Sequence, residues 1–194
     1  SWNVNSIRAR LNLIIDILET EKPDIICLQE TKVGKKDIWR RKGFKTFERI
    51  RTDNAGGLLI AVDEDLSPTL VYEGDDLEIL VVEIKVGIKK IQIINCYGPQ
   101  ETDSIEVVKE FWQIVEQRII EAKSNGCSII CETDANAKLG SKIIKGDPHE
   151  MSRNGKLFSE LIKRQNLFIL NSEPNCKGII TRYRETVNGI EKAV

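Results

Sequence analysis

The stretch Pro23-Asp24-Ile25-Ile26-Cys27-Leu28-Gln29-Glu30-Thr31 decides the fold of this chain. Pro23 ends the preceding segment, and residues 24–28 form a short apolar run that is typical of a buried strand. Glu30 lies just past the end of that run. A carboxylate held by a rigid buried strand is a suitable metal ligand, and a plain surface glutamate is the alternative.

Outward from this strand, the hydrophobic pattern alternates between helical and strand-like periods. Residues 6–20 carry apolar side chains at helical spacing, with Asn5 or Ser6 as the cap. Further helices are expected at about 102–123 and after Asn154, and further strands at 58–62, 77–86, 88–96, 127–131, 167–170 and 179–183. Polar motifs follow these strands, which predicts a layered α/β enzyme with its site at one sheet edge. We expect a single domain over residues 1–194.

The composition bounds the class of protein. The chain is 41% hydrophobic and 30% charged, and no apolar run is as long as a membrane span. It has five cysteines, an odd number, and no CxxC pair. This pattern favours buried reduced thiols over disulfides or a zinc site and predicts an intracellular protein.

Positive charge is concentrated in one segment. Between Lys32 and Arg51 nine cations face two acids, whereas the net charge of the whole chain is −1. A local basic segment of this kind can contact phosphates, and a solvated surface helix and loop is the alternative. Its position next to Glu30 favours phosphate contact.

Several other polar residues suit phosphodiester cleavage, which requires charge neutralisation, an activated water and help for the leaving oxygen. Asp134 and Asn136 share one side of an extended chain and can orient a water and hold a phosphate oxygen, unless they form an Asx turn. Tyr97 can donate its hydroxyl to phosphate or serve as a core aromatic. Asn3 and Asn5 can bond phosphate or support Glu30, or they can cap the helix. The only histidine, His149, is expected at the surface.

Together, the motifs resemble the endonuclease/exonuclease/phosphatase superfamily, the group that contains DNase I and the apurinic endonucleases. The resemblance covers the whole chain, and its later part is most similar to the endonuclease domains of non-LTR retrotransposons. It rests on segments in family order, among them Ser1-Trp2-Asn3-Val4-Asn5, Leu28-Gln29-Glu30-Thr31, Asn95-Cys96-Tyr97-Gly98-Pro99, Thr133-Asp134-Ala135-Asn136-Ala137 and Ile180-Thr181-Arg182.

This resemblance implies a DNase I-like fold, a four-layer sandwich of two packed, mostly antiparallel sheets flanked by helices. It implies a Mg²⁺-dependent DNA endonuclease, with Mn²⁺ as a substitute, that leaves a 3′-hydroxyl. Glu30 is then the metal ligand, and the catalytic residues are Asp134, Asn136, Tyr97 and Asn3. The expected DNA contacts are Lys32, Lys35, Arg40, Arg41, Thr181 and Arg182. The expected partner is double-stranded DNA, and no membrane is expected to take part. The resemblance also implies a nuclear monomer that is linked to, or derived from, a reverse transcriptase polyprotein.

The chain departs from the family pattern in three places. Thr133 replaces the usual Gly, and Gln100 replaces the usual Asn. Family members also continue into a strand bearing an Asp and a final Ser-Asp-His motif, which are not in this sequence. We therefore expect a C-terminally truncated domain that lacks its last strands and is weak or inactive.

Three alternatives stay open. An apurinic/apyrimidinic repair endonuclease would use the same residues on abasic DNA. A degenerate, non-catalytic module would bind DNA or protein. A phosphoinositide or nucleotide phosphatase of the same superfamily would use the basic segment on another polyanion.

Overall fold

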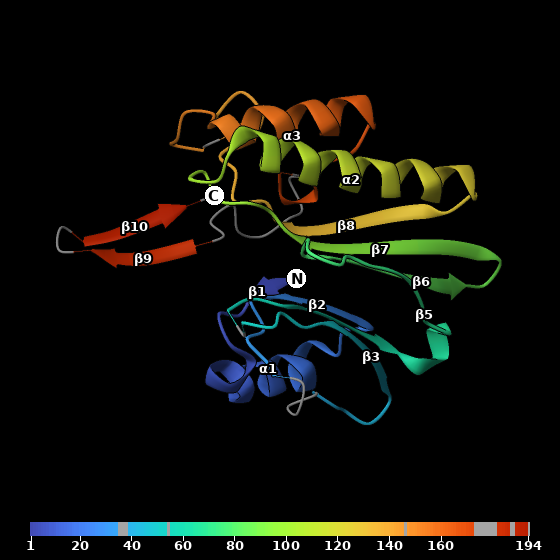
Figure 1. Ribbon diagram of the computed structural model, residues 1–194. Coiled ribbons are helices and arrows are strands. Elements are labelled where there is room, and N and C mark those ends of the chain that lie inside the picture. The colour runs from blue at the N-terminus through green and yellow to red at the C-terminus, as the bar shows by residue number, and fades with distance from the viewer. Residues whose placement is uncertain (35–38, 54, 146, 173–181, 187–188, 194) are drawn as a thin grey trace. The chain divides into compact units, whose positions relative to one another are not determined.

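The computed structural model describes residues 1–34, 39–53, 55–145, 147–172, 182–186 and 189–193 (Figure 1). The chain divides into two compact units. The first comprises residues 1–98 and 117–135, and the second comprises residues 99–116 and 136–194. The expectation of a single domain stays a prediction.

The first unit contains two four-stranded sheets. Sheet A has the order β1 (Trp2–Asn3), β2 (Ile25–Gln29), β4 (Leu58–Asp63) and β3 (Phe44–Arg49). Sheet B has the order β5 (Thr69–Glu73), β6 (Ile79–Val86), β7 (Lys89–Tyr97) and β8 (Ser128–Asp134). The pairs β1–β2 and β7–β8 are parallel, and all other neighbours are antiparallel.

The two sheets pack face to face through alternate residues of their strands, because successive side chains of a strand point to opposite faces. Cys27, Ile60, Leu80, Val82 and Ile93 belong to one buried cluster between the sheets. The other face of sheet A packs on α1 (Ile7–Glu21), a helix that lies below this sheet in Figure 1. Its cluster includes Ile7, Ile14, Leu18, Leu28 and Leu59. The predicted α/β fold, with two packed and mostly antiparallel sheets flanked by helices, is confirmed.

Helix α2 (Ile105–Ser124) spans both units, and its last residues, from Gln117, belong to the first. The second unit also contains α3 (Arg153–Arg164) and the antiparallel hairpin of β9 (Arg182–Thr186) and β10 (Gly189–Ala193). Ser152 caps α3 through its hydroxyl, which accepts the Gly155 N–H at 3.1 Å. Trp112 of α2 stacks on Phe158 of α3 with ring centroids 4.5 Å apart. This stack joins the two helices inside the second unit.

The described residues also form two short 3₁₀ helices, and the observed strands differ from the predicted ones in several places. The 3₁₀ helices are η1 (Glu64–Leu66) and η2 (Leu170–Ser172). The strand expected at 167–170 is wrong, because the Leu167 N–H bonds the Ile162 carbonyl behind α3 and Phe168 is 79% exposed. Residues 179–181 of the last expected strand lie outside the described residues. Strands β3 and β5 form where the sequence predicted none.

The thiol and membrane expectations can be compared with the part of the chain that is described. Cys27, Cys96, Cys127 and Cys131 are free thiols there, as expected. Burial raises the pKa of the Cys27 thiol to about 12, which keeps it protonated. Among the described helices, none has the length and apolar character that a bilayer crossing requires.

Candidate active site at the strand ends

Four predicted residues meet at one edge of the two sheets of the first unit. The Asn3 Nδ2 group donates to Glu30 Oε1 and to Asp134 Oδ2, each at 2.8 Å. Asn3 ends β1, Glu30 follows β2, and Asp134 ends β8 beside Tyr97, its partner in the ladder. The Tyr97 side chain bonds the Glu30 carboxylate. Because the parallel strands of both sheets end here, residues up to 131 positions apart form one cluster.

Backbone hydrogen bonds fix Glu30 against the start of α1. The Ser6 N–H donates to the Glu30 carbonyl at 2.8 Å, and the Ile7 N–H donates to the Thr31 carbonyl at 3.0 Å. Ser6 is the N-cap residue, as expected, but its side chain forms no capping hydrogen bond, because these carbonyls take the first free amides of the helix. The Asn5 side chain instead accepts a hydrogen bond from Lys32 Nζ.

The turn at Gly56 and Gly57 closes the other side of Glu30. Thr31 N–H donates to the Gly57 carbonyl, and Gly57 N–H donates to Glu78 Oε1 at 2.5 Å. Gly57 has a φ of 104°, and a Cβ there would lie 2.7 Å from Thr31 Oγ1. Only glycine fits this position, which explains the turn that the sequence predicted.

Strained backbone is concentrated at this edge. Among the described non-glycine residues with positive φ, Asn5, Ser6, Glu30 and Lys32 lie in the two loops that hold the cluster. Glu30 has a φ of 51°, which costs an L-residue about 1–2 kcal/mol. Outliers that gather around a carboxylate point to a functional constraint on its position.

Electrostatics keep Glu30 ionised. Partial burial raises the pKa of Glu30, but hydrogen bonds from Asn3, Tyr97 and Lys32 outweigh it, and the pKa falls below its ordinary value of 4.5. Lys32 Nζ lies 3.3 Å from Glu30 Oε2. An ammonium group therefore occupies a position on the outer carboxylate oxygen that suits a cation.

The donor set fits a hard cation. Within the described residues, no group of three or more His, Cys, Asp or Glu side chains is arranged to hold a metal ion. Mg²⁺ does not need one, because it binds through one or two carboxylates together with waters and substrate phosphates. The ionised Glu30 carboxylate, with a lysine ammonium standing in for the cation on its outer oxygen, fits this requirement.

Asn136 is placed differently from the expectation. Strand β8 ends at Asp134, and Asn136 has a left-handed φ of 45°, so the extended geometry assumed for this pair does not reach Asn136. Asn136 belongs to the second unit, where its carbonyl accepts the Asn154 side-chain amide at 3.4 Å. Its catalytic role stays a prediction.

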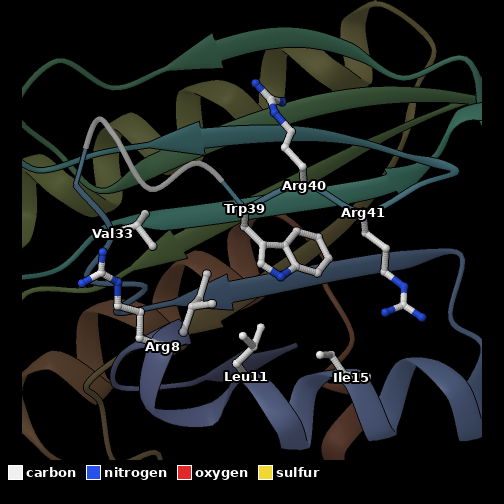
Figure 2. Close-up of a pocket in the computed structure, with 8 residues that line it drawn as sticks. Arg8, Leu11, Ile15, Val33, Trp39, Arg40 and Arg41 are labelled. Carbon is white, nitrogen blue, oxygen red and sulfur yellow. The ribbon is translucent and has the colours of Figure 1, made fainter.

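The structure describes the side chains of three of the six predicted DNA-contacting residues, namely Lys32, Arg40 and Arg41. Lys32 lies in the cluster, whereas Arg40 and Arg41 line a groove of about 370 Å³ beside α1 (Figure 2). Its other lining residues are Ile7, Arg8, Leu11, Ile15, Val33 and Trp39. Lys35 and Thr181 lie outside the described residues, and Arg182 is described only as the first residue of β9.

Two further members of the basic segment contradict a continuous phosphate-binding arm. Arg49 is 6% exposed and donates to the carbonyls of Gly74, Leu77 and Asp75. Arg51 pairs with Asp53 and Glu78. Arg49 ends strand β3 and Arg51 follows it, and both arginines are engaged in contacts within the protein. His149, expected at the surface, is 21% exposed and pairs with Asp147 at 3.0 Å in the second unit.

Sequence reasoning missed the buried amides behind the cluster. Gln29 and Asn95 are 1% and 0% exposed and bond to each other at 2.7 Å. Their signal in the sequence is a break in alternation. Each strand has a row of inward-facing side chains that is apolar at first and polar near the site. The rows are Ile25, Cys27 and Gln29 on β2, and Ile91, Ile93, Asn95 and Tyr97 on β7.

Two packed sheets with a carboxylate and amide cluster at their strand ends match what the motifs imply, and comparison with known proteins gives the family. The chain belongs to the Endonuclease/Exonuclease/phosphatase family, whose model matches residues 1–130. The predicted place in a family of nucleases and phosphatases is confirmed. A curated relative, Exodeoxyribonuclease III of Haemophilus influenzae, is 28% identical in an alignment of 111 residues that covers 52% of this chain and 40% of that protein. The match thus spans less than half of the relative.

Similar solved structures confirm the DNase I-like fold. The endonuclease domain of TRAS1, a telomere-specific non-LTR retrotransposon, has a TM-score of 0.73 and 22% identity, with 100% of this chain and 80% of that chain covered. The AP endonuclease LMAP from Leishmania major has a TM-score of 0.69 and 15% identity, with 85% and 65% covered. At these identities the likeness establishes the fold.

Proposed function

We propose that this chain is a Mg²⁺-dependent endonuclease domain that nicks double-stranded DNA. The observation that carries the proposal is the single amide of Asn3 bonded to both Glu30 and Asp134 at 2.8 Å. This amide holds two carboxylates side by side at the strand ends, and it supplies the spacing that a metal ligand and a water-orienting base require. The ionised state of Glu30 supports it further.

In this proposal each side chain of the site has its own role in the reaction. Glu30 holds the metal, and Asn3 orients both carboxylates. Asp134 orients the attacking water and accepts its proton. Tyr97 and Asn136 hold the non-bridging phosphate oxygens. As the water oxygen bonds to phosphorus, the bond to O3′ breaks and O3′ takes up a proton, which leaves a 3′-hydroxyl and a 5′-phosphate.

A Mg²⁺ ion held by Glu30 would neutralise charge on the phosphate and lower the pKa of a coordinated water. Lys32, Lys35, Arg40, Arg41, Thr181 and Arg182 contact the DNA backbone in this proposal. The likeness to the TRAS1 endonuclease domain supports a role in retrotransposon target-site cleavage. We extend the proposal to a nuclear monomer linked to, or derived from, a reverse transcriptase polyprotein.

A nicking assay on supercoiled plasmid tests the function. We expect slow conversion to open circles with Mg²⁺ or Mn²⁺, in keeping with the weak activity that the departures from the family pattern predict, and none with EDTA. Glu30→Gln and Asp134→Asn should each lower the rate by about 10²- to 10³-fold, as the loss of a group that stabilises transition-state charge does. Glu110→Gln is the matched control, because this exposed residue of α2 lies outside the cluster. Equal nicking by wild type and Glu30→Gln would contradict the proposal.

The relatives support a second candidate, a repair endonuclease acting on abasic sites. LMAP, an AP endonuclease by name, is the similar protein that favours it. Oligonucleotide duplexes with and without one abasic site separate the two candidates. Cleavage confined to the abasic duplex favours repair, and equal cleavage of both favours the target-site nuclease. If Mg²⁺ does not raise the melting temperature and neither duplex is cleaved, the result favours a non-catalytic binding module.

A further inference from the structure

The side chain of Asn95 joins the two sheets directly behind the candidate site. Asn95 is 0% exposed and comes from β7 of sheet B. Its Nδ2 group donates to the carbonyls of Leu28 and Leu59, each at 3.0 Å, which belong to two strands of sheet A. Its Oδ1 atom accepts the Gln29 amide at 2.7 Å. The oxygen and the nitrogen of this buried amide therefore both form hydrogen bonds with residues of sheet A.

The partners of Asn95 connect the two halves of the site. Tyr97 lies two residues after Asn95 on the same inward-facing row, because side chains alternate along a strand. Gln29 directly precedes Glu30. The network thus ties the strand that carries the Tyr97 hydroxyl to the strand that carries the Glu30 carboxylate. The bond between these two groups crosses from one sheet to the other.

A polar group at this position has a geometric consequence that an apolar one lacks. Apolar contact between sheets is non-directional and tolerates small sliding movements. Three short hydrogen bonds on one rigid amide allow a single offset between the strands. A buried amide is retained at low energetic cost only when its donors and acceptor are satisfied, as they are here.

We propose that Asn95 is a positioning residue, which fixes the offset between β7 and β2 so that Tyr97 meets Glu30 in the productive geometry. This inference rests on the proposed nuclease function. It assigns Asn95 no contact with substrate. A displacement of the reacting groups by about 1 Å costs up to about 100-fold in rate, so a loosened offset is visible in turnover.

Kinetics of Asn95→Leu test the proposal, with Ile93→Ala as the matched control on the same strand and face. Both variants are assayed at a temperature where thermal melts show them folded. We expect Asn95→Leu to lower kcat by about 10- to 100-fold with KM for DNA unchanged. Ile93→Ala should keep kcat, although it melts earlier. In a Tyr97→Phe background, Asn95→Leu should add little further loss, because the positioned group is already absent.

Hydrogen exchange gives a readout that does not depend on activity. In Asn95→Leu we expect faster exchange at the amides of Tyr97 and Thr31, and unchanged exchange at Ile84, near the opposite end of β6. Uniform acceleration at both ends, with kcat unchanged, would show a merely structural role and overturn the inference. Full activity in Glu30→Gln would instead refute the nuclease proposal, while the exchange pattern still decides the role of Asn95.

A milder variant covers the case in which Asn95→Leu does not fold. Gln29→Met keeps the volume of the side chain and removes only the bond to Asn95 Oδ1 and the bond to Ser1. We expect a smaller fall in kcat, about 2- to 5-fold, with the same local exchange pattern. No fall in kcat and no local change in exchange would overturn the inference.

Discussion

The interface between the two sheets differs at its two ends. Away from the site it is apolar, and Val62, Val82, Ile84 and Ile93 are at most 1% exposed. At the site end, buried polar side chains cross between the sheets, namely Gln29, Asn95, Arg49 and Glu78. The same pair of sheets therefore uses two kinds of contact within the length of one strand.

The two ends contribute differently to the protein. Apolar burial stabilises in proportion to the area removed from water, by about 25 cal/mol per Å², and it has no preferred direction. Buried hydrogen bonds add little net stability but define distances, since their partners cannot be left unpaired. We conclude that the apolar end holds the fold and that the polar end holds the geometry of the site.

The largest expected effect comes from breaking the apolar end. Ile60→Ala removes a fully buried side chain between the sheets and should lower the free energy of unfolding by about 2–5 kcal/mol. Urea unfolding measures this loss, with Ile60→Val as the milder control. Where the variant is still folded, its kcat for nicking should equal that of wild type. A large loss of kcat in a folded Ile60→Ala protein would remove the distinction between the two ends.

Breaking a polar contact at the site end should cost less stability. Arg49→Met leaves the carbonyls of Gly74, Leu77 and Asp75 without their donor, at a cost of about 1–3 kcal/mol. Arg49→Lys is the control, because it keeps the charge and loses the planar donor fork. Chemical denaturation of both proteins checks the prediction. A methionine that stabilises the protein would show that the hydrogen bonds of Arg49 are dispensable.

The sequence predicts the apolar end of the interface better than the polar end. Apolar runs predict β2 and β4, since buried strands consist mainly of such residues. Strand β3 was missed because Lys45, Glu48 and Arg49 hide its alternation within the basic segment. Strand β5 was missed because most of its side chains are exposed, so no buried period marks it.

The candidate site shows the same limit. Motifs identified Asn3, Glu30, Tyr97 and Asp134, which the fold brings together. Their hydrogen bonds could not be read from the sequence, because sequence separation carries no information on which side chains meet across sheets. Asn95 was missed for a related reason. A single amide in an apolar row has no local pattern, and its function depends on partners in another sheet.

The charge of the site can be tested by pH. The pKa of Glu30 is lowered in the folded protein, so its contribution to stability is present above its ordinary value of 4.5 and is lost as pH falls through the folded pKa. Asn3→Ala removes one hydrogen bond that lowers this pKa. It should reduce stability at neutral pH by about 1 kcal/mol, given the partial exposure of the carboxylate.

Thermal melts of wild type and Asn3→Ala between pH 3 and pH 7 measure the difference. We expect the gap in Tm to be constant near neutral pH and to close as the pH falls below about 4.5, where the Glu30 carboxylate becomes protonated. Asn12→Ala, an exposed position on α1, controls for the loss of an amide elsewhere. A gap that widens in acid would show that Asn3 does not favour the ionised form.

The smallest expected change in stability concerns the backbone strain of two left-handed residues, one at a helix end and one at the site. Lys22, after α1, has a φ of 46°, nearly the same left-handed conformation as Glu30, with a φ of 51°. Lys22→Gly should relieve strain at a helix end and stabilise the protein by about 0.5 kcal/mol. It stabilises because the strain relieved at the left-handed position exceeds the conformational entropy that glycine adds to the unfolded chain. Glu30→Gly relieves similar strain but should abolish nicking. Denaturation midpoints and plasmid nicking of the two variants separate strain at a cap from strain at the site. If Lys22→Gly also slowed nicking, the strained conformation at the end of α1 would belong to the site as well.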